Sequence, residues 1–188
     1  ALDQLLASPL GERIDTQRIV AAGHSYGANT TLLAAGAQIE REGRRVALHD
    51  ERLCAAVLLS APPFYGEREP QRILGSVHVP TLHVTATGDI IRIPGYWSGA
   101  EDRIAVFDAI GSKHKALAVF EGGSHSMFTD RPGTGGMELN PRVKLATKEL
   151  SLAFMQTRLG IGSPLALPLW VERYRAIIAK HDGAFGVG

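Results

Sequence analysis

Residues 18–29 read RIVAAGHSYGAN, and the interpretation of the whole chain depends on this stretch. The mostly apolar run at 18–22 predicts a short β-strand, and a helical pattern begins at Ala28. Between them, the pentapeptide GHSYG at 23–27 matches the pattern G-x-S-x-G. A serine on a sharp turn between a strand and a helix projects its hydroxyl above the sheet, as a nucleophile elbow requires. The stretch therefore predicts that Ser25 is a nucleophile.

The residues around Ser25 have physical reasons to be there. A tight strand-to-helix turn strains the serine backbone, so the neighbouring side chains must be nearly absent, and glycines at 23 and 27 meet that need. The helix that follows directs free N–H groups and the positive end of its dipole toward the serine. Negative charge that develops on a reacting group is stabilised at such a position.

Three more apolar runs predict strands at 53–60, 81–86 and 116–120. They are continuous rather than alternating, which is typical of strands covered by helices on both faces. Helices are predicted at 28–40, 99–110, 140–159 and 168–180. Residues 183–188 are expected to form a loose tail. This alternation predicts an α/β protein with a parallel sheet, organised as a single domain over residues 1–188.

Composition limits the classes of function. The chain has 188 residues, of which 45% are hydrophobic and 21% charged, with a formal net charge of +1. Twenty basic residues interspersed with nineteen acidic ones argue against a nucleic-acid-binding surface. No apolar run approaches the ~20 residues of a membrane-spanning helix. A single cysteine, Cys54, excludes an internal disulfide and leaves the cellular compartment open.

A nucleophilic serine needs a general base, and seven histidines compete for that role. His125 follows the fourth predicted strand in the glycine-containing segment FEGGSH at 120–125. Ligands and catalytic groups gather at the carboxyl ends of the strands in open α/β sheets, so His125 is the predicted base. His24 is expected to point away from Ser25, and His83 lies within the third strand, where core packing is expected.

The base needs an acid to orient it, and Asp89 follows the third predicted strand in ATGD at 86–89. The chain order Ser25, Asp89, His125 is the order that the nucleophile-elbow hydrolases use. Glu67, on the loop after the second strand, is the alternative acid. Asp102 is interpreted as a charge on a helix face.

Apolar side chains after the same strands are predicted to line a substrate pocket. They are Phe64 and Tyr65, Tyr96 and Trp97, and Met127. No metal-binding or phosphate-binding motif is found in the sequence, so neither a metal nor another cofactor is expected.

The segments GHSYG, TATGD and EGGSH resemble the three catalytic motifs of the α/β-hydrolase superfamily, in the same order. Residues 18–159 carry the resemblance. Within the superfamily the chain is similar to bacterial proteins related to dienelactone hydrolases, chlorophyllases and platelet-activating-factor acetylhydrolases. True dienelactone hydrolases have cysteine as the nucleophile, so Ser25 argues against that specific activity.

The resemblance implies that the four strands correspond to strands five to eight of an eight-stranded sheet. The earlier strands, and the loop that supplies one of two oxyanion-hole N–H groups, are then missing from the chain, while the N–H of Tyr26 supplies the other. The strand at 18–22 would be an apolar edge, and Leu32 and Leu33 could lose their cover. Self-association, or pairing with a missing N-terminal part, is therefore expected.

The predicted function is hydrolysis of a small-molecule carboxylic ester through an acyl-enzyme on Ser25. Acyl transfer or perhydrolysis on the same three residues is an alternative. A second alternative is a non-catalytic binding or subunit module with the same fold. The sequence indicates neither the natural substrate nor the compartment.

Overall fold

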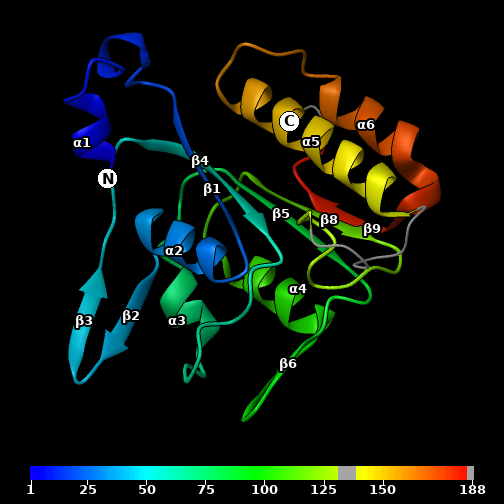
Figure 1. The fold of residues 1–188 in the computed structure, drawn as a ribbon, viewed down its shortest axis with the longest axis horizontal. Helices are drawn as coiled ribbons and strands as arrows, with labels where there is room; N and C mark the ends of the chain where they lie inside the picture. Colours follow the sequence, from blue (N-terminus) through cyan, green and yellow to red (C-terminus); the bar gives the residue numbers. More distant parts are fainter. Residues whose placement is uncertain (131–138, 186–188) are drawn as a thin grey trace.

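The centre of the protein is a five-stranded sheet, seen in a computed structural model that describes residues 1–130 and 139–185 (Figure 1). The order of its strands is β1-β4-β5-β8-β9. The first four run parallel: β1 (Ile19–His24), β4 (Leu53–Leu59), β5 (Thr81–Ala86) and β8 (Lys115–Phe120). β9 (Ile178–Gly183) runs antiparallel to β8 at the far edge. The four predicted strands and their parallel arrangement are confirmed.

Helices cover both faces of this sheet (Figure 1). One face packs against α2 (Tyr26–Ala34), α3 (Pro70–Leu74) and α4 (Ala100–Ala109). The other packs against α5 (Leu139–Arg158) and α6 (Ala166–Tyr174). Along β4, Ala56 and Leu58 belong to the first core and Ala55 and Val57 to the second. Successive side chains of a strand point to opposite faces, so a continuous apolar run supplies both cores at once.

Shorter elements lie outside these layers. α1 (Leu2–Leu6) and a 3-10 helix (Gly11–Arg13) precede β1, and a second 3-10 helix (Arg175–Ile177) joins α6 to β9. Two hairpins project from the body of the molecule (Figure 1). They are β2 (Gln38–Arg41) with β3 (Arg44–Ala47), and β6 (Ile91–Ile93) with β7 (Tyr96–Ser98). Within the described ranges, no helix combines the length and the apolar character that a membrane crossing requires.

Two predicted helices are too long. The helix predicted at 28–40 ends at Ala34, because Gly36 adopts a φ of 116° and its carbonyl accepts a 2.7 Å hydrogen bond from Ser76 Oγ. The chain then enters β2. The helix predicted at 168–180 ends at Tyr174, and its last part is β9. Helical periodicity alone did not distinguish that segment from an edge strand.

Two further expectations are wrong. Leu32, which was expected to be exposed, is fully buried, and Leu33 packs beside it, because α2 lies against α3 and the sheet. The tail is not loose where it is described: Phe185 is buried, and its ring stacks on Trp170 at 6.1 Å. The last three residues of the tail, 186–188, lie outside the described part.

The two edges of the sheet differ in character. β1 pairs only with β4 among the described strands and contains the apolar residues Ile19 and Val20. β9, at the opposite edge, carries Lys180, His181 and Asp182. Charged side chains protect an edge strand from pairing with another chain, whereas an apolar edge invites it. β1 is therefore the edge at which association is expected.

We expect the 188-residue chain to self-associate through β1, which sedimentation velocity would measure. Ala22 is exposed on β1, and Ala22→Lys should shift the protein toward monomer because a lysine on an edge strand opposes pairing. The matched control is Ala179→Lys, an exposed alanine on β9, which should leave the distribution unchanged. A wild-type chain that sediments as a stable monomer at all concentrations would contradict this prediction.

Candidate active site

Ser25 lies where β1 passes into α2, in a conformation that few residues adopt. Its φ is 56° and its ψ is −124°, and its N–H donates a 2.9 Å hydrogen bond to the carbonyl of Leu59 on β4. A Cβ at Gly23 would lie 2.2 Å from the carbonyl oxygen of Gly27, so only glycine fits at position 23. Gly27 differs from the prediction, because a Cβ there would point into open space. The steric constraint of the turn thus acts at Gly23, on the side of the strand.

His125 joins Ser25 to Asp89. Its Nε2 lies 2.8 Å from Ser25 Oγ, and its Nδ1 lies 2.8 Å from Asp89 Oδ1. Because a carboxylate accepts, Nδ1 carries the proton and Nε2 of the neutral ring is free to accept the serine proton. The structure thus brings together the three residues predicted from GHSYG, TATGD and EGGSH. Their side chains form a continuous chain of contacts in the order Ser25, His125, Asp89.

Close backbone contacts hold the acid loop against the histidine loop. A Cβ at Gly88 would lie 2.2 Å from the carbonyl oxygen of Gly123, so the two loops touch where both lack side chains. Gly122 donates its N–H to Thr87 Oγ1 at 2.8 Å. Gly122 and Gly123 have φ values of 65° and 80°, which glycine tolerates best. These glycines follow the ends of β5 and β8 and let Asp89 and His125 meet.

Asp89 is fully buried and nevertheless ionised. Burial by itself would raise the pKa of its carboxyl, but the hydrogen bond with His125, the charge of Arg103 and the hydroxyl groups of Ser60 and Thr85 together lower that pKa to about 2. Thr85 Oγ1 donates to Asp89 Oδ2 at 2.7 Å, so each carboxylate oxygen has a partner. Asp89 is therefore a fixed negative charge behind His125.

Two further residues lie against these groups, and the sequence did not indicate that they would. His24 Nε2 lies 2.9 Å from the backbone carbonyl of His125, and the two rings are 4.9 Å apart. Arg103 Nη2 lies 3.5 Å from Asp89 Oδ1. The expectation for His83 is met: it is buried in the core against the ring of Phe107, and burial lowers its pKa to about 3.

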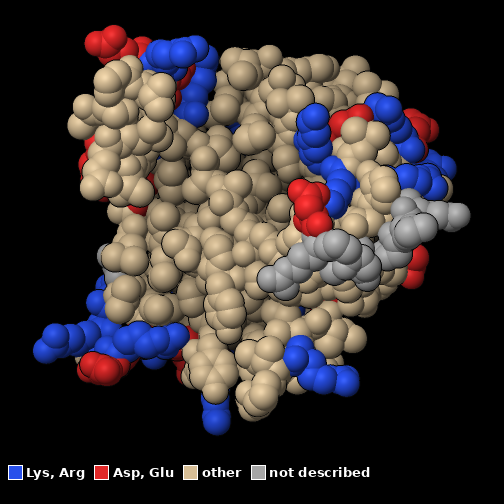
Figure 2. Space-filling model, in the orientation of Figure 1, with Lys and Arg blue, Asp and Glu red and all other residues tan. Residues whose placement is uncertain are grey.

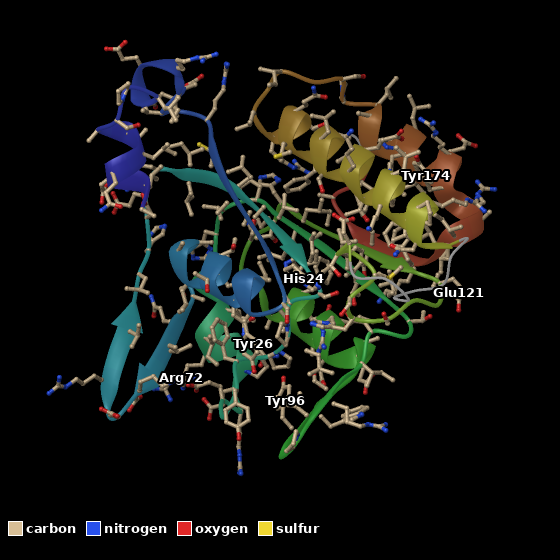
Figure 3. The ribbon with its side chains drawn as sticks, in the orientation of Figure 1. His24, Tyr26, Arg72, Tyr96, Glu121 and Tyr174 are labelled. Carbon is tan, nitrogen blue, oxygen red and sulfur yellow. The ribbon has the colours of Figure 1, made fainter. Side chains whose placement is uncertain are left out.

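Tyr26, labelled in Figure 3, is the first residue of α2, and its amide follows the N-cap residue Ser25 directly in the chain. The N–H groups in the first turn of a helix have no partner within the helix, so they are available to an oxyanion. The Tyr26 side chain is 58% exposed and does not fill this position. The structure thus places one candidate oxyanion donor next to Ser25.

The five predicted pocket residues do not form one pocket, which corrects that expectation. Met127 is fully buried in the core under α5, and Phe64 is buried in the opposite core with α2, α3 and α4. The ring of Tyr65 contacts that of Tyr96 at 5.5 Å on the surface, and Trp97 is half exposed on the β6–β7 hairpin. Position after a strand did not reveal which side chains turn inward.

The alternative acid, Glu67, is not near His125. It forms a 2.5 Å ion pair with Arg41 on the β2–β3 hairpin, so that candidate is wrong. Asp102 is more than a surface charge, because its Oδ2 accepts a 3.0 Å hydrogen bond from the N–H of Gly99 and caps α4. In the part of the chain that is described, no group of three or more His, Cys, Asp and Glu side chains could hold a metal ion.

Comparison with solved structures identifies the fold. The chain superposes on a mutant puromycin hydrolase with a TM-score of 0.55 and 15% sequence identity, over 86% of this chain and 24% of that one. Esterase 2 of Thermogutta terrifontis, in its apo form, gives a TM-score of 0.48 and 17% identity, over 79% of this chain and 58% of that one. The chain thus spans about a quarter of the length of the hydrolase and less than two thirds of that of the esterase.

The likeness to the puromycin hydrolase and the sheet order together show that this chain has the α/β-hydrolase fold. No protein-family model matches the sequence, and no curated protein matches it. The narrower resemblance to proteins related to dienelactone hydrolases stays a prediction.

The two candidate acids can be compared directly. Asp89→Asn should lower kcat by up to ~10⁴-fold while the protein still folds, because an amide cannot stabilise an imidazolium and favours the wrong ring tautomer. Glu67→Gln is the matched control, and it should leave kcat unchanged because Glu67 contacts Arg41 instead. The measurement is turnover of an activated aryl ester, with circular dichroism to verify folding. A large loss in Glu67→Gln and none in Asp89→Asn would reverse the assignment.

Proposed function

We propose that this chain carries the catalytic centre of a serine hydrolase that cleaves a carboxylic ester through an acyl-enzyme on Ser25. The strongest support is the pair of 2.8 Å contacts that join Ser25 and Asp89 to the two ring nitrogens of His125. The strained backbone of Ser25 is further support, because strain of this kind persists where function requires it.

In the proposed reaction, Ser25 Oγ attacks the carbonyl carbon of the ester while its proton passes to His125 Nε2. The resulting imidazolium is stabilised by Asp89, whose carboxylate remains ionised. The tetrahedral intermediate expels the alcohol, which takes the proton from His125. Water then attacks the acyl-enzyme and gives a proton to the same nitrogen, and release of the carboxylic acid returns that proton to Ser25.

The oxyanion of each tetrahedral intermediate would accept a hydrogen bond from the N–H of Tyr26. The family resemblance assigns a second donor to a loop that belongs to the earlier strands. We propose that such a donor comes from a segment that pairs with the free edge of β1. One donor of this kind contributes about 3–4 kcal/mol to transition-state stabilisation, or about a hundred- to a thousand-fold in rate.

Apolar groups of the substrate would contact the surface beside the three residues. Exposed apolar side chains follow two of them directly in the chain, Tyr26 after Ser25 and Ile90 after Asp89. On the face shown in Figure 2, charged side chains of both signs lie mostly toward the rim, and a broad central area carries neither. These features favour an uncharged ester. They do not distinguish hydrolysis from acyl transfer or perhydrolysis, in which another nucleophile replaces water.

A fluorophosphonate probe should label Ser25 and no other serine, which mass spectrometry of the labelled peptide would show. Ser25→Ala should abolish the labelling and lower kcat on an activated aryl ester by at least ~10⁴-fold, because the nucleophile is lost. Ser124→Ala is the matched control, since that serine directly precedes His125 in the chain but its hydroxyl has no hydrogen-bond partner in the described part of the protein.

Failure of Ser25→Ala to change the labelling would reject the proposed nucleophile. A wild-type chain that is neither labelled nor active, also after addition of the segment that pairs with β1, would favour a non-catalytic binding or subunit module.

A further inference from the structure

Arg103 is a buried charge directed at the acid of the proposed catalytic centre. It lies in the first turn and a half of α4 and is only 2% exposed. Its guanidinium divides its contacts: Nη2 faces Asp89 Oδ1 at 3.5 Å, while Nη1 donates to Ser98 Oγ and, at 3.2 Å, to the carbonyl oxygen of Gly99. Arg103 therefore links the end of the β6–β7 hairpin to Asp89.

Burial of a guanidinium costs free energy unless well-placed partners compensate for it, so the contacts of Arg103 have to account for its position. The atom it faces, Asp89 Oδ1, is the same atom that accepts the hydrogen bond from His125 Nδ1. Thr85 binds the other carboxylate oxygen. His125 and Arg103 thus contact one carboxylate oxygen of Asp89 and Thr85 the other, and these contacts hold the orientation of the carboxylate.

We propose that Arg103 is a positioning residue that aligns the Asp89 carboxylate on His125 and whose charge acts on His125 through Asp89. The proposal rests on the proposed function, because a neutral His125 is the base that takes the proton of Ser25. Arg103 does not touch the reacting atoms and acts only through Asp89.

The direction of the effect follows from the charges around His125. The groups that face it are Asp89 from the loop after β5, Arg103 from α4 behind Asp89, and His24 from β1. Asp89 favours the imidazolium form of His125, and the positive charge of Arg103 opposes it. Removal of that charge should therefore raise the pKa of His125 and keep the protonated, inactive form present up to higher pH.

The test separates charge from geometry with two variants and two readouts. Arg103→Gln removes the charge, and it should raise the pKa of His125 in an NMR titration by about 0.5–1 unit. The acid limb of kcat/KM should move to higher pH by the same amount. Arg103→Lys keeps the charge but loses the forked contacts of the guanidinium. Its kcat should therefore fall, while the pKa of His125 and the pH of the acid limb of kcat/KM stay as in the wild type. Arg13→Gln, an exposed arginine in the 3-10 helix before β1, is the control that changes neither.

Each result has one meaning. Unchanged titration in Arg103→Gln, or the same shift in Arg103→Lys, overturns the proposal. If Arg103→Gln does not fold, Arg103→Met replaces it, and Ser98→Ala tests alignment by removing one anchor of the guanidinium: kcat should fall with no change in titration. The NMR titration does not need turnover. A shifted His125 in a chain that cleaves no ester, also after addition of the segment that pairs with β1, would therefore reject the proposed function and not the effect of Arg103 on His125.

Discussion

The parallel alignment of β1, β4, β5 and β8 is the constraint on which the candidate site depends. Because the carboxyl ends of parallel strands meet at one edge of the sheet, three residues from distant parts of the chain arrive at the same place. Ser25 follows β1, Asp89 follows β5, and His125 follows β8. The loops after β5 and β8 then bring Asp89 and His125 into contact, because their backbones touch at Gly88 and Gly123, where there is no room for a side chain. The fold brings the groups near one another, and the glycines determine whether they meet.

A second constraint is electrostatic, and it concerns the surroundings of Asp89. Asp89 has no contact with water, so its charge must be balanced by the protein. His125, Thr85 and Arg103 do this together, and the effect of burial on the pKa of Asp89 is more than offset. The arrangement makes the acid a permanent anion. In the proposed reaction, the low pKa of Asp89 keeps it from competing for the proton of Ser25, which therefore passes to His125.

Much of this was predictable because it depends on local patterns. The pentapeptide at 23–27 predicted the elbow, and the glycine-rich loops after two apolar runs predicted Asp89 and His125. What was missed depends on tertiary contacts. Arg103 directly follows Glu101 and Asp102 at the start of α4, and a charged residue in such a run is expected at the surface. Phe64 and Met127 resemble pocket residues by position, yet their side chains turn into the two cores. Residues 178–180, the first half of β9, were mistaken for helix because the antiparallel pairing of β9 with β8 is a long-range contact that this segment does not encode by itself.

The elbow and the open edge of the sheet are parts of one strand, so a segment that paired with this edge would lie close to the proposed nucleophile. β1 ends at His24, one residue before Ser25, and it pairs with β4 alone among the described strands. A segment that adds to the free edge of β1 in parallel would end beside Ser25, as β4 does on the other side, where Leu59 accepts the N–H of Ser25. The loop that follows such a segment would lie within reach of an oxyanion on a substrate at Ser25. The apolar edge at which we expect association is thus also the position from which, in the proposed function, a second oxyanion donor would most directly come.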